Sequence, residues 1–171
     1  MDGASAEETV IAACRMNNVD LLEKPVTEQV GNELNFLNTA RDPLGNGCLH
    51  VCAQYGSVEC LDWLLDIEGL DVNIPNTMNH DTPLHVAVQY CLKDKVISLH
   101  MVEMLMEVGA NPLLLNKDRY RPIDLVPGDF RSEFAPVLEA HTITKQFADD
   151  IVVDDDDEGS EGSGDSGDES D

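Results

Sequence analysis

Cysteine and histidine alternate at Cys48, His50 and Cys52, and these residue types can bind zinc or supply a catalytic thiolate. A metal site on a helix needs ligands three or four residues apart, because residues two apart point to different sides. A catalytic thiol would also need a cationic neighbour in a cleft, and the sequence places none there. We therefore expect no catalytic residue, no metal site and no cofactor.

The segment that contains these residues recurs, so a repeat must position them. Residues 47–53, which begin Gly-Cys-Leu-His, return as Thr-Pro-Leu-His-Val-Ala at 82–87 and as Arg-Pro-Ile-Asp-Leu-Val at 121–126. The anchors at positions 48, 83 and 122 are 35 and 39 residues apart. A period in the thirties is typical of a solenoid of stacked helix pairs.

Local signals predict the helices of each unit. Thr82 can cap a helix with its hydroxyl, and Pro83 suits the first helical position because no amide is needed there. The small Ala53 and Ala87 allow neighbouring helices to approach closely. Second helices are expected at 58–66, around Trp63, and at 99–107, each followed by a glycine that can end it.

The Thr-Pro-Leu-His-x-Ala motif resembles the ankyrin repeat, and the resemblance covers roughly residues 5–140. It implies an all-α solenoid of about four units, two of them caps, with a protein-binding role and no enzyme activity. It also implies that His50 and His85 hydrogen-bond the backbone of an adjoining turn. At the amino terminus we expect capping helices at 6–17 and 19–22, interrupted by Pro25.

The later units depart from the motif in three places. The turn before Thr82 has Asn79-His80, with one extra residue, where the family has glycine, and asparagine tolerates the positive φ required. Residues 91–98 lengthen one connection and carry Lys93 and Lys95; they are either a tolerated surface insertion or a contact specific to the partner. The last unit has Asp124 in the histidine slot, and 129–146 should form its outer helix.

Charge and cysteine content limit the classes of function. The chain of 171 residues has 10 Lys and Arg against 34 Asp and Glu, a formal net charge of −24. Such a chain should be repelled by nucleic acids and by anionic membranes. The five cysteines lie in apolar helical patterns, which favours buried thiols in the cytosol or nucleus. No signal peptide or membrane span is expected.

The charge divides the chain into two parts, a repeat domain at 5–147 and an acidic tail at 148–171. The tail holds 12 of the acidic residues and no Lys or Arg, so it carries half of the net charge. Its composition predicts disorder, because little can be buried. The densest acidic run is Asp154, Asp155, Asp156, Asp157 and Glu158. A calcium site in this run is disfavoured, since it lacks fixed geometry.

The resemblance also predicts a docking face, at repeat positions that vary within the ankyrin family. Tyr55, Tyr90 and Tyr120 occupy such slots, and tyrosine is enriched at protein interfaces; the alternative is that the rings cover neighbouring helices. The predicted concave face comprises Leu44, Asn46, Val51, Gln54, Tyr55, Met78, Asn79, Asp81, Val86, Gln89, Tyr90, Lys117, Asp118 and Tyr120.

Two functions remain open from the sequence. The first is an escort or chaperone for a basic protein, such as a nucleic-acid-binding or ribosomal protein. A short repeat domain with a polyacidic tail is similar in layout to fungal ankyrin proteins that escort a newly made ribosomal protein. The second is a general ankyrin adaptor or regulatory subunit whose tail only aids solubility. In both cases the partner is a protein, and the capped ends favour a monomer.

Overall fold

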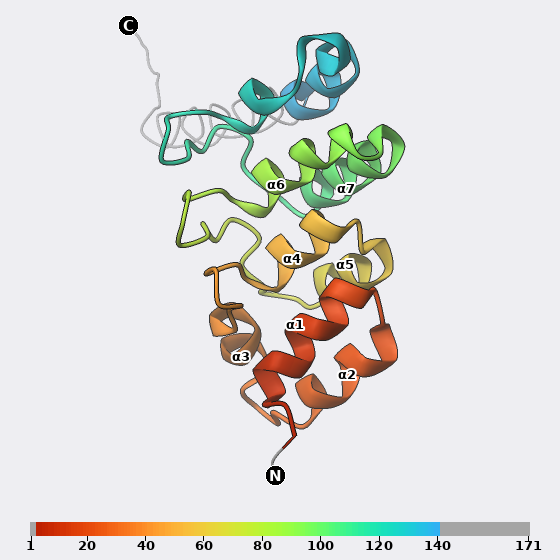
Figure 1. Ribbon diagram of the computed structural model, residues 1–171, viewed down its shortest axis with the longest axis vertical. Coiled ribbons are helices and arrows are strands. Elements are labelled where there is room, and N and C mark those ends of the chain that lie inside the picture. Colours follow the sequence, from red (N-terminus) through yellow and green to blue (C-terminus); the bar gives the residue numbers. More distant parts are fainter. Residues whose placement is uncertain (1–2, 141–171) are drawn as a thin grey trace, which may run out of the picture.

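The computed structural model describes residues 3–140, which form a stack of helix pairs along one axis (Figure 1). Among these residues the regular elements are all helical, so the expected all-α solenoid is confirmed. The elements are α1 (Ala6–Met16), α2 (Val19–Thr27), α3 (Glu33–Thr39), α4 (Cys48–Tyr55), α5 (Val58–Leu65), α6 (Pro83–Gln89), η1 (Tyr90–Leu92), α7 (Lys95–Glu107), η2 (Pro122–Leu125) and η3 (Gly128–Phe130), followed by helical residues 131–140.

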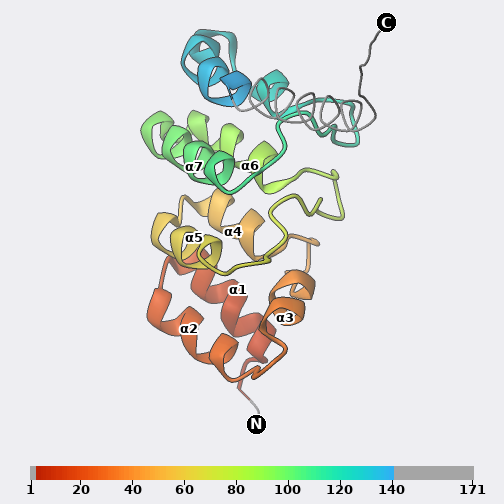
Figure 2. The ribbon, with the colours of Figure 1, turned by 180° about the vertical axis from the view of Figure 1, so that it is seen from behind.

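The helices form two columns, with α1, α4 and α6 in an inner column and α2, α5 and α7 in an outer one. Three turns project from the inner column on one side of the stack, and we call them fingers 1, 2 and 3, at residues 40–47, 70–82 and 110–121 (Figure 2). In the first unit, α3 lies on this side and leads into finger 1. The fingers and inner helices therefore share one face of the molecule.

The helix signals in the sequence match the structure where the repeat is regular. The Thr82 hydroxyl accepts a hydrogen bond from the His85 amide at 3.4 Å, and Pro83 is the first residue of α6. Ala53 and Ala87 are fully buried between the stacked helices. Trp63 is half-buried against the core, which includes the outer-helix residues Leu61, Leu64, Met101 and Leu105.

The expected break at Pro25 is wrong, because α2 continues through it to Thr27. A proline in a helix removes one backbone hydrogen bond. Here Pro25 lies in the last turn of α2, so few helical bonds remain to be lost, and its ring is buried. The amide of Glu28 still bonds to the Lys24 carbonyl at 3.1 Å and closes the helix.

The outer helix of the third unit begins four residues earlier than predicted. The Asp94 side chain accepts a hydrogen bond from the Ile97 amide at 3.1 Å, so α7 begins at Lys95. The 3₁₀ turn η1 takes up Tyr90–Leu92. Most of the insertion is therefore helical, and the extended connection expected at 91–98 is not found.

Two non-glycine residues adopt left-handed backbone conformations in the fingers. In finger 2 this residue is His80, with φ of 58°, and not Asn79 as predicted; in finger 3 it is Arg119, with φ of 70°. The outer helix of the last unit is present at 131–140. The remainder of that predicted helix, the domain boundary at 147 and the acidic tail lie outside the described residues.

Candidate partner-binding site

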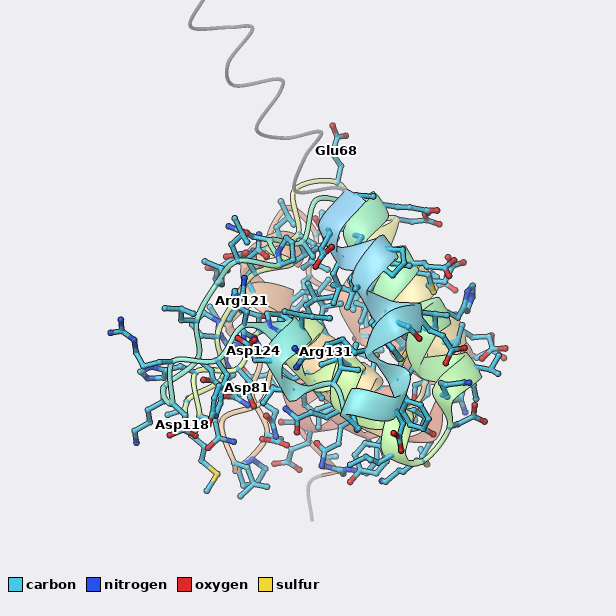
Figure 3. All side chains as sticks on the ribbon, turned by 90° about the horizontal axis from the view of Figure 1, so that it is seen from above. Glu68, Asp81, Asp118, Arg121, Asp124 and Arg131 are labelled. Atoms are coloured by element: carbon cyan, nitrogen blue, oxygen red, sulfur yellow. The ribbon has the colours of Figure 1, made fainter. Side chains whose placement is uncertain are left out.

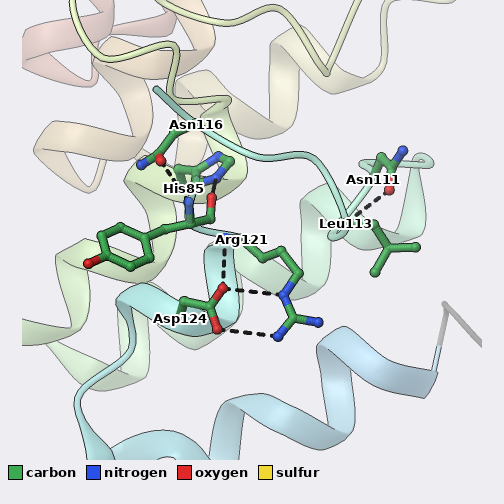
Figure 4. A network of polar contacts seen from close by, with 7 residues as sticks. His85, Asn111, Leu113, Asn116, Arg121 and Asp124 are labelled. Atoms are coloured by element: carbon green, nitrogen blue, oxygen red, sulfur yellow. Dashed lines mark hydrogen bonds and ion pairs between the residues drawn. The ribbon is translucent and has the colours of Figure 1, made fainter. Parts of the chain in front are cut away.

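Two buried histidines fix the fingers to the inner helices. His50 Nε2 donates to the Asp81 carbonyl at 2.7 Å, and His50 Nδ1 accepts from the Gly47 amide at 3.1 Å. His85 repeats the arrangement one unit later, with its Nε2 2.8 Å from the Tyr120 carbonyl (Figure 4). Each imidazole thus joins its own helix to the next finger, as the sequence predicted.

Burial also sets the charge of these imidazoles. It lowers the pKa of His50 to about 4, and it lowers the pKa of His85. Only the neutral ring can accept the Gly47 amide proton and donate to a carbonyl at once. Since both nitrogens of His50 are used, this ring has no lone pair free for a metal ion.

The last unit has an aspartate, Asp124, at the position of these histidines. Asp124 accepts the Arg121 amide at 2.9 Å, as the histidine Nδ1 atoms do in the earlier units (Figure 4). Its carboxylate also pairs with the Arg121 guanidinium at 3.2 Å. A carboxylate has no proton to donate to a further finger, so Asp124 completes its own turn and cannot repeat the donated bond that His50 and His85 make.

Asparagine side chains join the fingers to one another. Asn76 Nδ2 donates to Asn46 Oδ1 at 3.0 Å, which links fingers 2 and 1. Asn116 Nδ2 donates to Asp81 Oδ1 at 2.9 Å, which links fingers 3 and 2. The same amides accept backbone protons, such as that of Tyr120 on Asn116 Oδ1 at 2.9 Å (Figure 4). The fingers are therefore a rigid, hydrogen-bonded surface.

A groove of about 350 Å³ lies between fingers 1 and 2 and the inner helices α4 and α6. Its rim carries Leu44 and Met78, which are 56% and 58% exposed although both are apolar. Its floor is polar and buried, and it includes Asp81 at 5% exposure. The lining residues are Leu44, Asn46, Gln54, Asn76, Met78, Asn79, Asp81, Val86, Gln89, Tyr90 and Lys93.

The groove brings together most of the residues predicted for the docking face. Those that line it are Leu44, Asn46, Gln54, Met78, Asn79, Asp81, Val86, Gln89 and Tyr90. Lys117, Asp118 and Tyr120 are exposed on finger 3 and do not line it. Tyr55 is exposed at the end of α4, where its ring lies 5.6 Å from the Arg15 guanidinium.

The inclusion of Val51 in the docking face is wrong, because its side chain is fully buried. Val86 occupies the same slot one unit later and is only half-buried. The difference follows from the stacking: α4 packs against a full helix on each side, α1 and α6. On its outer side, α6 meets only the 3₁₀ turn η2, so Val86 stays accessible.

Two lining residues are absent from the predicted concave face: Asn76, which the sequence reasoning missed, and Lys93, which it named only as part of a possible partner contact in the insertion. An asparagine recurs in every finger, at Asn46, Asn76 and Asn116, and this periodicity could have identified the first. Lys93 belongs to the insertion and reaches the Tyr90 ring, 5.8 Å from its centroid. The other inserted lysine, Lys95, bonds instead to Glu133 at 2.9 Å within the chain.

Tyr90 has a packing role as well as a place in the groove. A Cβ atom added to Gly56 would lie 2.5 Å from the Tyr90 hydroxyl, so the ring covers the end of α4. Gly56 also has a positive φ of 67°, which glycine adopts readily. The alternative of a covering ring therefore describes Tyr90, and its contact with a partner stays a prediction.

Cysteine chemistry does not contribute to the groove. All five cysteines are buried free thiols, as expected. Burial raises the pKa of Cys60 to about 11, and a hydrogen bond with Cys14 together with burial raises that of Cys48. Among residues 3–140, no three His, Cys, Asp or Glu side chains are grouped so that they could hold a metal ion. No helix in this part of the chain is both long and apolar enough to cross a membrane.

Charged side chains are spread around the stack, and few are paired. Viewed along the axis, Asp81 and Asp118 lie on the finger side, well apart from Glu68 (Figure 3). Within residues 3–140 the ion pairs are Lys95 with Glu133 and Arg121 with Asp124. Most carboxylates of the repeat domain thus have no cationic partner in the part of the chain that the structure describes.

Known proteins share this repeat. A family profile described as ankyrin repeats in three copies matches residues 9–116. An ankyrin repeat-containing protein from Saccharomyces cerevisiae is 38% identical over 143 residues, which is 81% of this chain and 78% of the yeast protein.

Two larger proteins share part of the repeat region. The inhibitor of Bruton tyrosine kinase from Xenopus laevis is 32% identical over 91 residues, 53% of this chain and 6% of that protein. The NF-kappa-B inhibitor zeta from Bos taurus is 29% identical over 104 residues, 60% of this chain and 14% of that protein. Ankyrin repeats bind other proteins and are generally non-catalytic. The match to the repeat profile and the similarity to the yeast protein together show that this chain belongs to the ankyrin repeat family.

Proposed function

We propose that this protein escorts a basic protein by holding one segment of it in the groove while the acidic tail covers other cationic side chains. The observation that carries the proposal is the groove itself, in which exposed Leu44 and Met78 surround a buried polar floor. Large exposed apolar side chains beside fixed hydrogen-bonding groups are typical of protein-binding surfaces.

Charge favours a basic partner over a neutral one. The chain carries a net charge of −24, half of it in residues 148–171. Because few carboxylates within residues 3–140 are paired, this part of the chain adds its own negative potential to that of the tail. Complementary charge accelerates association and disfavours wrong partners. We infer that the protein acts as a monomer, because the ends of the stack are capped. We also infer that it acts in the cytosol or nucleus, where its free thiols would stay reduced.

The test compares the full chain with a chain that ends at Phe147. Each is used to capture proteins from its native lysate at low and high salt, and the captured proteins are identified by mass spectrometry. The screening length is about 8 Å at physiological ionic strength, so an electrostatic contribution should weaken as salt increases. The proposal predicts a basic partner whose capture depends on both the tail and the salt concentration.

The alternative function is an adaptor or regulatory subunit with an inert tail. It predicts a partner of ordinary charge that both forms capture equally at either salt concentration. A Met78→Glu chain is the control for both functions, because it alters the groove rim and leaves the tail unchanged. A partner captured equally by Met78→Glu and wild type would contradict a role for the groove.

A further inference from the structure

Asp81 is held in a fixed position at the floor of the groove. Its backbone amide donates to Asn76 Oδ1 at 3.0 Å, and its carbonyl accepts from His50 Nε2 at 2.7 Å. The residue is 5% exposed, yet it lines the groove. These two bonds fix the backbone of Asp81, so its side chain starts from a fixed position at the groove.

The carboxylate of Asp81 is incompletely satisfied. Oδ1 accepts from Asn116 Nδ2 at 2.9 Å, whereas Oδ2 has only Gln89 Nε2, at the long distance of 3.5 Å. Within residues 3–140 the ion pairs involve other residues, so no cation is paired with Asp81. Buried carboxylates are normally paired, because removing a charge from water is unfavourable. Asp81 Oδ2 therefore has the capacity to bind a cation that enters the groove.

The apolar residues of the groove suit the aliphatic part of a basic side chain. Val86, Tyr90 and the exposed Leu44 and Met78 line the groove together with the buried Asp81, so apolar surface and a carboxylate lie in the same groove. Arginine and lysine side chains suit such a groove, because each has an aliphatic stem that ends in a cation. Lys93 also lines the groove, but it lies over the Tyr90 ring, 5.8 Å from the centroid, and is not paired with Asp81.

We propose that the groove binds an arginine or lysine side chain of the partner, with its stem against Met78 and Tyr90 and its cationic end on Asp81. This inference rests on the proposed function and specifies the contact by which the partner is recognised. A charge-assisted hydrogen bond to a buried carboxylate is among the stronger polar contacts. The segment that carries the basic residue should also carry apolar neighbours that cover Leu44 and Met78.

The probe is a random dodecapeptide display library selected in parallel against the full wild-type chain and against Asp81→Asn and Glu68→Gln chains. Asp81→Asn keeps the shape and the acceptor for Asn116 but removes the charge. Glu68→Gln removes one negative charge from an exposed site away from the groove, so it controls for bulk electrostatics (Figure 3). Thermal unfolding of each chain establishes that the variants are folded.

The proposal predicts a selected motif with one obligatory Arg or Lys beside apolar residues, on wild type and Glu68→Gln alike. A synthetic peptide of that motif should bind Asp81→Asn at least about tenfold more weakly, and replacing its arginine by citrulline should have a similar effect. Equal affinity for wild type and Asp81→Asn, a motif without a basic residue, or no selected motif would overturn the proposal.

Failure of this inference can be told apart from failure of the proposed function. A motif without a basic residue that still loses affinity on Met78→Glu would leave the groove as the docking site and remove only the role of Asp81. A motif whose affinity does not change on Met78→Glu would contradict the groove itself. Binding that falls equally on Asp81→Asn and Glu68→Gln would reflect net charge and would overturn the specific contact.

Discussion

His50 and Asp81 are 31 residues apart in the sequence, yet His50 Nε2 lies 2.7 Å from the Asp81 carbonyl oxygen. The bond joins helix α4 to finger 2 and requires a neutral imidazole, since the other ring nitrogen accepts the Gly47 amide. Stability should therefore depend on pH through this ring. Burial lowers the folded-state pKa of His50 from 6.5 to about 4.

Between these two values the unfolded chain binds more protons at this site than the folded chain does. The contribution of His50 is thus complete above pH 6.5 and is lost as the pH falls toward 4, with a steepest slope of about 1.4 kcal/mol per pH unit. Urea unfolding measured from pH 7.5 to 4.5 should show a smaller loss for His50→Gln than for wild type. The exposed His100→Gln is the control and should follow wild type. Parallel curves for wild type and His50→Gln would contradict this account.

The five buried thiols should be unreactive in the folded protein. A disulfide reagent attacks the thiolate, and burial raises the pKa of Cys52, Cys60 and Cys91. At pH 7.5 we expect labelling to proceed only as fast as the protein opens, with all five thiols reacting at once in denaturant. Rapid labelling of even one thiol in the folded state would show that the unit containing it opens more easily than its burial implies.

The contact between Lys95 and Glu133 should make a small contribution to stability. The ammonium lies 2.9 Å from Glu133 and 5.3 Å from the centroid of the Phe130 ring, but both charged side chains are partly exposed. A double-mutant cycle with Lys95→Gln and Glu133→Gln should give a coupling energy of about 0.2–1 kcal/mol. Additive single effects would mean that the ion pair contributes nothing and that Lys95 acts only through its contact with Phe130.

Substitutions at the groove and at Tyr55, which lies outside it, should differ in their effect on partner binding. Leu44→Glu places a charge at the rim of the groove and should weaken capture of the partner at least about tenfold, with little change in thermal stability because the side chain is 56% exposed. Tyr55→Ala should leave capture nearly unchanged, because its ring contacts Arg15 outside the groove. The reverse result would place the docking surface at the end of α4.

Removal of the Lys93 charge should strengthen binding of a basic peptide. Lys93 lies in the groove, so its ammonium repels an incoming cation at short range. Lys93→Gln should lower the dissociation constant of the selected peptide severalfold, most clearly at low salt. The control is Lys24→Gln on α2, which removes the same charge from an exposed position. An equal gain in both variants would indicate a general charge effect.

The sequence predicted those parts of the fold that depend on local chemistry. Thr82 and Pro83 correctly predicted the start of α6. The Leu-His motif correctly implied the hydrogen bonds from His50 and His85 to the neighbouring fingers. The errors arose where stacking decides the outcome. Pro25 is accommodated because its ring is buried near the end of a helix, a condition that residue type does not reveal.

The sequence predicted which repeat positions form the candidate site, but it did not predict the groove that their side chains enclose. Val51 and Val86 occupy the same repeat position, and the number of helical neighbours decides whether the side chain there reaches solvent. The unpaired state of the Asp81 carboxylate depends on the fixed fingers around it. No single residue type indicates such a state, because it depends on the positions of Asn116 on finger 3 and Gln89 on α6 relative to Asp81 on finger 2.

Asp124 has a consequence for how such a chain could lengthen during evolution. A unit with histidine at the third position of its inner helix offers a donor to the next finger, whereas Asp124 in that position of the last unit offers none. A gene duplication that copied the last unit would therefore produce a neighbour that is not tied to its predecessor. Growth of the array is therefore expected by duplication of an internal unit, or after a change of Asp124 to histidine.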